Sequence, residues 1–105
     1  LAVLYYKQKN YKEAEKYYKL AADKKYDKSI YSLASMYHND LKKYKEAEKY
    51  YKIAADMGDS NAMFELGVLY FQTGNIEEGR KYYEKAAENG HERAIKILNG
   101  EINGV

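Results

Sequence analysis

The only side chains in this chain that titrate near neutral pH, and so suit a general base, are two histidines, His38 and His91. Nucleophilic catalysis would also need a Ser, Thr or Cys paired with such a base, and a third group that orients the base. The two histidines lie in different repeats of the chain, no nucleophile is paired with either, and there is no Cys. We therefore predict that the protein is not an enzyme and has no catalytic residue.

Metal and cofactor chemistry has equally few candidate residues. Two histidines without any cysteine form a weak set of metal ligands. No strand is evident in the sequence, so no glycine-rich phosphate loop follows one. We expect neither a metal nor a cofactor.

Tyrosine is abundant, with fourteen residues, and aromatic platforms in basic grooves bind single-stranded nucleic acids. Here the positive charge is confined to one end. Residues 1–28 carry a net charge of +4, residues 29–58 carry +1 and residues 59–105 carry −3. Six tyrosines also have the spacing of core residues, namely Tyr5, Tyr18, Tyr37, Tyr51, Tyr70 and Tyr83. We expect no nucleic-acid partner.

The elements that carry these side chains are repeated along the chain. Residues Tyr11–Asp23 and Tyr44–Asp56 are identical except for Leu20 in the first copy and Ile53 in the second, and a looser third copy covers 76–88. The three copies begin 33 and 32 residues apart. A fixed period of this length indicates a stack of helical units, none of which buries its apolar face alone.

Each unit is predicted to contain two helices, A and B, so the fold class is all-α. In helix B, Ala14 and Tyr18 begin an i, i+4, i+7, i+8 stripe that recurs in the later copies. Helix A of the third unit contains Gly67, which we expect to lie under the side chain of Tyr83; Gly79 should admit a similar approach. The second unit has one extra residue, since seven residues separate Tyr37 from Tyr44 where the other units have six.

Capping residues predict where these helices begin and end. Asn10 and Asn75, each followed three residues later by Glu, resemble capping boxes, and Asp27 and Asp59 are plausible N-caps. The positions after helices B call for a left-handed backbone, which suits Gly58 and Gly90. Lys25 holds the same position in the first unit, where it fits less well.

We expect a single domain over 1–105 with units at about 1–25, 26–58 and 59–90, a closing helix at 91–98 and about seven helices in all. The chain has no initiator Met and opens within the repeat pattern, which indicates a fragment of a longer protein. No apolar run is long enough to cross a bilayer, and no signal-peptide pattern is present. We expect no membrane partner, and the lack of Cys favours the cytoplasm.

Two repeat families resemble this pattern. Leu66 and Gly67, followed by Tyr70, Gly74, Tyr83 and Ala86, look like the tetratricopeptide repeat. The doubled Ala86–Ala87 with Gly90 and Ala94 after it is still more similar to the related Sel-one-like repeat, and residues 50–62 repeat these marks. The resemblance implies a right-handed superhelical solenoid of antiparallel helix pairs, a concave face lined by helices A, and a non-catalytic scaffold or adaptor for a protein or peptide.

Family geometry places on that concave face the helix A residues beside the core stripe. Large aromatic side chains flanked by amides suit an extended or helical peptide. The alternative is that these rings only pack between neighbouring helices A. The candidate partner-binding residues are Tyr6, Tyr31, Ser35, His38, Asn39, Asn61, Phe64, Val68, Phe71, Gln72 and Arg93.

Some tetratricopeptide domains hold a C-terminal carboxylate in a clamp of Lys, Asn and Arg. Only Arg93 matches that pattern here, so we predict no such clamp. A second possible function is weak self-association, in which chains stack end to end because one end is basic and the other acidic.

Overall fold

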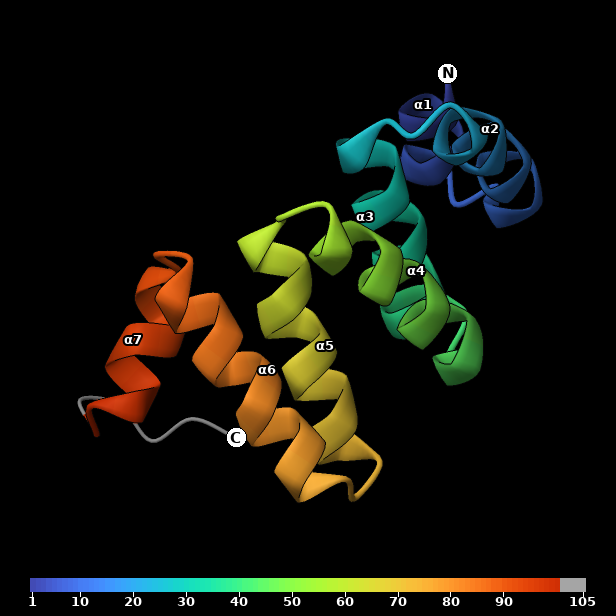
Figure 1. The fold of residues 1–105 in the computed structure, drawn as a ribbon. Helices are drawn as coiled ribbons and strands as arrows, with labels where there is room; N and C mark the ends of the chain where they lie inside the picture. Colours follow the sequence, from blue (N-terminus) through green and yellow to red (C-terminus); the bar gives the residue numbers. More distant parts are fainter. Residues whose placement is uncertain (101–105) are drawn as a thin grey trace. The chain divides into compact units, whose positions relative to one another are not determined.

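The computed structural model describes residues 1–100, except for the side chain of Asp27. These residues form seven α-helices and no strand, so the all-α prediction is confirmed. A π-helical segment, η1 (Met36–Asp40), continues the third helix. The helices are α1 (Ala2–Lys7), α2 (Tyr11–Asp23), α3 (Asp27–Ser35), α4 (Tyr44–Asp56), α5 (Ser60–Gln72), α6 (Ile76–Glu88) and α7 (Glu92–Leu98) (Figure 1). Within residues 1–100, none of these helices has the length and apolar character needed to cross a membrane.

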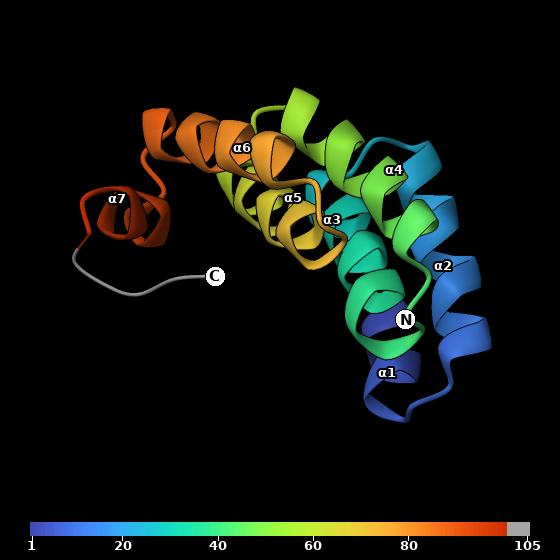
Figure 2. The same cartoon turned by 90° about the horizontal axis from the view of Figure 1, so that it is seen from below.

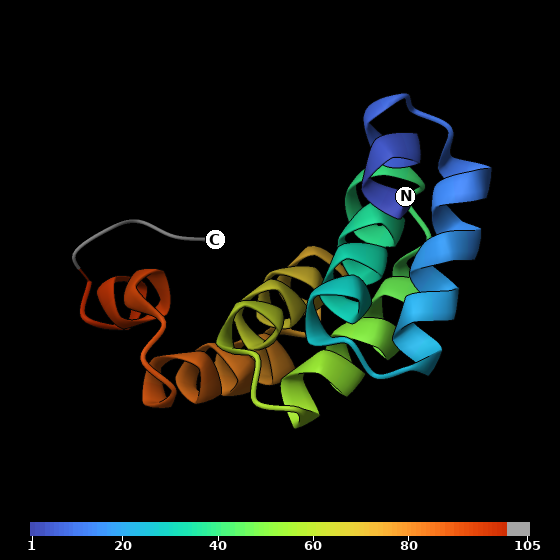
Figure 3. The same cartoon turned by 90° about the horizontal axis from the view of Figure 1, so that it is seen from above.

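The helices belong to two compact units, of which the first is Leu1–Tyr50 and the second begins at Tyr51. In the first unit α2 lies beside both α1 and α3 (Figure 3). Its core is formed by Ala14 and Tyr18 of α2 with Leu33 and Ala34 of α3, all less than 10% exposed. The predicted stripe of helix B therefore faces the core.

In the second unit α5 and α6 run antiparallel and side by side, and α7 lies beside α6 (Figure 2). A Cβ atom added to Gly67 on α5 would lie 2.6 Å from Cδ1 of Tyr83. A Cβ atom added to Gly79 on α6 would lie 2.9 Å from Cδ2 of Phe71. Both predicted close approaches are confirmed, and both bring an aromatic ring onto a backbone.

A pair of tyrosine rings recurs in all three repeats. Tyr5 stacks on Tyr17 at 5.7 Å between ring centroids, and Tyr37 stacks on Tyr50 at 5.9 Å. Tyr70 and Tyr82 form the third pair at 5.7 Å. The first tyrosine of each Tyr-Tyr doublet in helix B thus contacts helix A of its own repeat, while the second lies in the core.

Two of the four predicted N-terminal caps are confirmed. Asp59 Oδ1 accepts from the N–H groups of Asn61 and Ala62 at 2.9 and 3.2 Å, and Asn10 Oδ1 accepts from Glu13 N at 3.4 Å. Asn75 makes no cap hydrogen bond, and its amide nitrogen donates to Thr73 Oγ1 at 3.4 Å. The prediction for Asp27 is wrong by one residue, since the N-cap of that helix is Tyr26.

The helix ends differ in residue type between the two units. Lys25, Gly58 and Gly90 all have positive φ, as predicted, with values of +61°, +95° and +84°. Lys9 and Lys42 also have positive φ, at positions that correspond to Gly74. Left-handed positions in the first unit are thus filled by Lys, and those after α4, α5 and α6 by Gly.

The extra residue of the second repeat is absorbed by η1. Leu41 N–H donates to the carbonyl of Met36, five residues earlier, and Lys43 N–H donates to that of Tyr37. In the other repeats the corresponding bonds run from Asn10 to Tyr5 and from Asn75 to Tyr70. The insertion widens one helical turn and leaves the loop that follows nearly unchanged, as is common for π-bulges.

Candidate partner-binding site

In the first unit the predicted site residues are bonded to neighbouring side chains. Tyr6 O–H donates to Asp40 Oδ2 at 2.8 Å, and this bond, with partial burial, raises the pKa of Tyr6 to about 12. Tyr11 O–H donates to Asp40 Oδ1 at 3.4 Å. Asn39 donates to Ser35 Oγ at 3.1 Å. Tyr31 is half-buried and also has a partner within the chain.

His38 was predicted to face a partner, but its side chain is only 5% exposed. The π-helical turn is the reason, because it directs Met36, Tyr37 and His38 inward together. The ring of His38 meets the edge of Tyr44 at 5.9 Å. The prediction that His38 lies on a binding surface is therefore wrong.

Phe64 was also predicted to anchor a partner, and it too is buried, with 6% exposure. Its ring stacks on Tyr83 at 4.9 Å and on His91 at 4.4 Å between centroids. Because Gly67 lets Tyr83 approach α5 closely, the Tyr83 ring reaches Phe64 and fills the space on that side. Phe64 is therefore a core residue of the second unit, and its prediction as a partner-binding residue is wrong.

The remaining candidates of α5 lie along one side of the helix. Asn61, Val68, Phe71 and Gln72 fall within about 100° of one another around the helix axis, and together we call them the α5 strip. Asn61 and Gln72 are exposed, while Val68 and Phe71 are half-buried. The strip follows helix A of the third repeat, where the resemblance implies a concave surface.

An apolar pocket of about 280 Å³ lies at the C-terminal end of the α5 strip, lined by Val68, Phe71, Gln72 and Tyr83. Phe71 meets the edge of Tyr83 at 4.9 Å between centroids. The absence of a side chain on Gly79 lets Phe71 lie down against α6, which forms one wall of this pocket.

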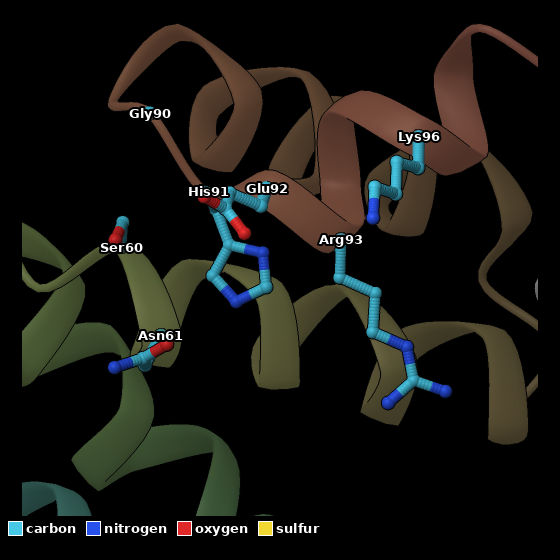
Figure 4. A pocket seen from close by; sticks show the side chains of 7 residues that line it. All are labelled: Ser60, Asn61, Gly90, His91, Glu92, Arg93 and Lys96. Carbon is cyan, nitrogen blue, oxygen red and sulfur yellow. The ribbon is translucent and has the colours of Figure 1, made fainter.

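A polar pocket of about 590 Å³ lies at the other end of the strip, where the beginning of α5 faces the beginning of α7 (Figure 4). Two predicted residues line it, Asn61 and Arg93. The other lining residues, Ser60, Gly90, His91, Glu92 and Lys96, are not among the predicted candidates, although family geometry also places Lys96 on the concave face. Lys96 follows Arg93 by three residues on a helix, and that spacing was the available signal.

His91, which lines this pocket, is also the N-cap of α7. Its Nδ1 accepts from Ala94 N at 3.2 Å and so caps α7. Burial, and next the charge of Arg93, lower the pKa of His91. The imidazole is therefore neutral at pH 7, and because Nδ1 accepts, the proton is on Nε2.

A third pocket, of about 460 Å³, lies in the first unit between α2 and the start of α4. It is lined by Lys19, Lys43 and Lys45 together with Glu15, Glu46, Tyr37 and Tyr44. Tyr37 O–H donates to Glu15, and Lys19 Nζ lies 3.8 Å from Glu15 Oε2. Burial of Tyr37 and its hydrogen bond to Glu15 raise the pKa of Tyr37. Glu15 thus contacts both Tyr37 and Lys19 within this pocket.

Comparison with protein families agrees with the helix pairs. A tetratricopeptide repeat model matches residues 34–94, which is more than half of the 105 residues. The chain belongs to the tetratricopeptide repeat family. A second tetratricopeptide repeat model matches residues 1–24. No curated protein matches the chain.

Tetratricopeptide repeats are generally protein–protein interaction modules and typically non-catalytic scaffolds. Both matching models describe the tetratricopeptide repeat, so the Sel-one-like subtype stays a prediction. The α5 strip and its two pockets lie along helix A of the third repeat.

Proposed function

We propose that the chain is a non-catalytic interaction module whose partner lies along the α5 strip. The observation that carries this proposal is the pair of pockets at the two ends of one helix face. Val68 and Gln72 at one end, and Asn61 and Arg93 at the other, retain accessible surface after the core has formed. A partner segment that follows the strip would contact both pockets.

The corresponding face of the first unit is the weaker candidate. Its polar groups are engaged with one another, as in the bonds from Tyr6 to Asp40 and from Asn39 to Ser35. A partner would have to displace these bonds, which removes most of the gain from forming new ones. This difference favours the second unit as the binding unit.

A displayed library of random peptides, selected on the whole chain, tests the proposal. Val68→Glu and Gln72→Lys change the strip, and Lys81→Glu changes an exposed position on α6 as the matched control. Binding should fall at least about ten-fold for each strip variant and stay unchanged for the control, with circular dichroism verifying the helices. Peptides that bind both strip variants as tightly as the parent chain would contradict the proposal.

A further inference from the structure

Two turns of the first unit meet at one of its ends. The turn between α1 and α2 lies beside the turn between η1 and α4, because Asp40 accepts hydrogen bonds from Tyr6 at 2.8 Å and from Tyr11 at 3.4 Å. Figures 2 and 3 show both turns at the same end of the unit, opposite the turn between α2 and α3. We call residues 7–13 and 40–46 together the lysine edge.

The lysine edge has more cations than carboxylates. It contains six lysines and three acidic residues, which gives a net charge of +3, and all six lysines are exposed. Of the carboxylates, Asp40 accepts from the two tyrosines, Glu13 is half-buried and Glu46 is exposed. No lysine of the edge forms an ion pair with a carboxylate that the structure describes. The six lysines are Lys7, Lys9, Lys12, Lys42, Lys43 and Lys45.

The fold does not require these lysines. The matching stretch of the third repeat, residues 72–78, also connects a helix A to a helix B, and it contains two glutamates and no lysine. Lys9 and Lys42 have φ of +60° and +56°, a conformation that Gly74 adopts at the matching position without steric cost. A side chain that is kept in a strained conformation points to a role outside the fold. Positive charge is the property that Lys9 and Lys42 have and glycine lacks.

The kind of cation at this edge narrows the class of partner. Both arginines of the chain lie in the second unit, so the edge has only lysines. An ammonium group is a compact point charge that suits a dispersed field of negative charge, whereas nucleic-acid recognition favours the planar guanidinium group. Tyr6 and Tyr11 are also poor platforms for bases, because their rings contact each other at 5.8 Å and their hydroxyls are bonded to Asp40.

An exposed aromatic side chain accompanies the charges. Tyr44 lies between Lys43 and Lys45 and is 42% exposed, although its ring also contacts His38 at 5.9 Å. A tyrosine with an apolar ring and a polar hydroxyl is favourable at the level of lipid headgroups. Several lysines with an interfacial tyrosine match the boundary between water and an anionic membrane.

We propose that the lysine edge docks on the anionic headgroups of a phospholipid membrane. The lysine ammonium groups lie among the headgroup phosphates and carboxylates, and the helices stay in water. The expectation of no membrane partner rested on the lack of a run that could cross a bilayer, which a peripheral contact does not need. The inference is independent of the proposed function, because the α5 strip belongs to the second unit.

Co-sedimentation of the whole chain with lipid vesicles tests this inference. One set of vesicles contains phosphatidylcholine alone, and the other contains phosphatidylcholine with about 30% phosphatidylserine. Each lysine close to an anionic surface increases binding about five-fold, and salt screens this attraction. We expect the chain to sediment with the anionic vesicles at about 50 mM salt, to be released at about 500 mM salt, and to stay in solution with the neutral vesicles.

Glycine substitutions at the left-handed positions separate binding from folding. Lys9→Gly combined with Lys42→Gly removes two charges of the edge and should weaken binding to the anionic vesicles at least about ten-fold. Lys25→Gly is the matched control, because Lys25 also has positive φ but lies at the opposite end of α2. It should leave binding within about two-fold of that of the parent chain. Both variants should melt no lower than the parent chain, so a loss of binding cannot be a loss of folding.

Several results would overturn the inference. The chain could fail to sediment with anionic vesicles at low salt, or sediment equally with neutral ones, and either result would exclude an electrostatic contact with lipid. Equal losses for Lys25→Gly and for the double variant would show that net charge binds and the lysine edge does not. A chain that binds a single-stranded RNA oligonucleotide and no vesicle would assign the edge to nucleic acid instead.

Discussion

At the scale of single residues, Gly67 decides how the second unit packs. The ring of Tyr83 occupies the space where a Cβ atom would lie, and the carbonyl of Gly79 is 3.0 Å from the same point. Overpacking of this kind costs about 1–3 kcal/mol, and Ala regains about 1 kcal/mol of helix propensity. We expect Gly67→Ala to lower the free energy of unfolding in urea, by up to about 2 kcal/mol.

The equivalent residue of the preceding repeat provides the reciprocal control for this prediction. Ala34 is fully buried, so Ala34→Gly removes a packed methyl group and adds backbone entropy to the unfolded chain. It should also be destabilising, by about 1–2 kcal/mol. If Gly67→Ala stabilised the chain, the close contact between Tyr83 and the backbone would be refuted.

His91 gives the fold a pH dependence at the same scale. Its folded pKa lies below the ordinary value of 6.5, so the unfolded chain takes up the proton first as pH falls. The contribution of neutral His91 is complete above about pH 6.5 and is lost as pH falls through the folded pKa. Urea denaturation between about pH 7.5 and 5 should show this loss.

His91→Asn is the matched variant, because Asn is a good N-cap and does not titrate in this range. The stability difference between the parent chain and this variant should shrink or change sign below pH 6. A difference that is constant over the whole range would show that the neutral imidazole makes no pH-dependent contribution to the fold.

At the scale of elements, the helix ends of the first unit hold three strained positions. Lys9, Lys25 and Lys42 have φ between +56° and +61°, a conformation that costs an L-residue about 1–2 kcal/mol. Glycine adopts it freely but loses more entropy on folding. Each change to Gly should therefore raise stability by about 0.5–1 kcal/mol.

Thermal unfolding of the triple variant measures this effect. Lys16→Gly, an exposed position inside α2, is the control and should instead be destabilising by about 1 kcal/mol. A triple variant that melts below the parent chain would contradict the assignment of these three positions as left-handed ends.

The repeat pattern predicted these elements well because their residues recur in register. The core stripes of helix B, the glycines at Gly58 and Gly90 and the approach of Tyr83 to Gly67 all follow from spacing. The positions of His38 and Phe64 did not, since both depend on what surrounds the helix. One inserted residue becomes a π-helical turn that buries His38, and two neighbouring rings enclose Phe64.

The candidate site was predictable only in part, for a related reason. Asn61, Val68, Phe71, Gln72 and Arg93 were all selected from the helix A pattern and line the two pockets. The pockets themselves depend on side-chain directions, which spacing alone does not specify. Pairing of the first tyrosine in each Tyr-Tyr doublet with helix A escaped prediction, because that position lies one residue off the core stripe.

At the scale of the whole molecule, the charge gradient along the sequence is the basis for end-to-end stacking. The closing helix weakens this idea, because α7 carries Glu92 against Arg93 and Lys96 and is not acidic. Because opposite charges at the two ends are not present on the helices themselves, we expect sedimentation at about 50 and 500 mM salt to give the same monomeric species. A larger species at low salt alone would favour stacking.

The most direct test of a binding surface on α5 is an NMR titration of the isotope-labelled whole chain. The probe is a peptide selected from the displayed random library on the whole chain. We predict that the largest amide shift changes occur at Asn61, Val68, Gln72 and Arg93, and that Lys81 and Glu84 on the exposed side of α6 stay unchanged. Shift changes centred on α6, or on the helices of the first unit, would contradict the account.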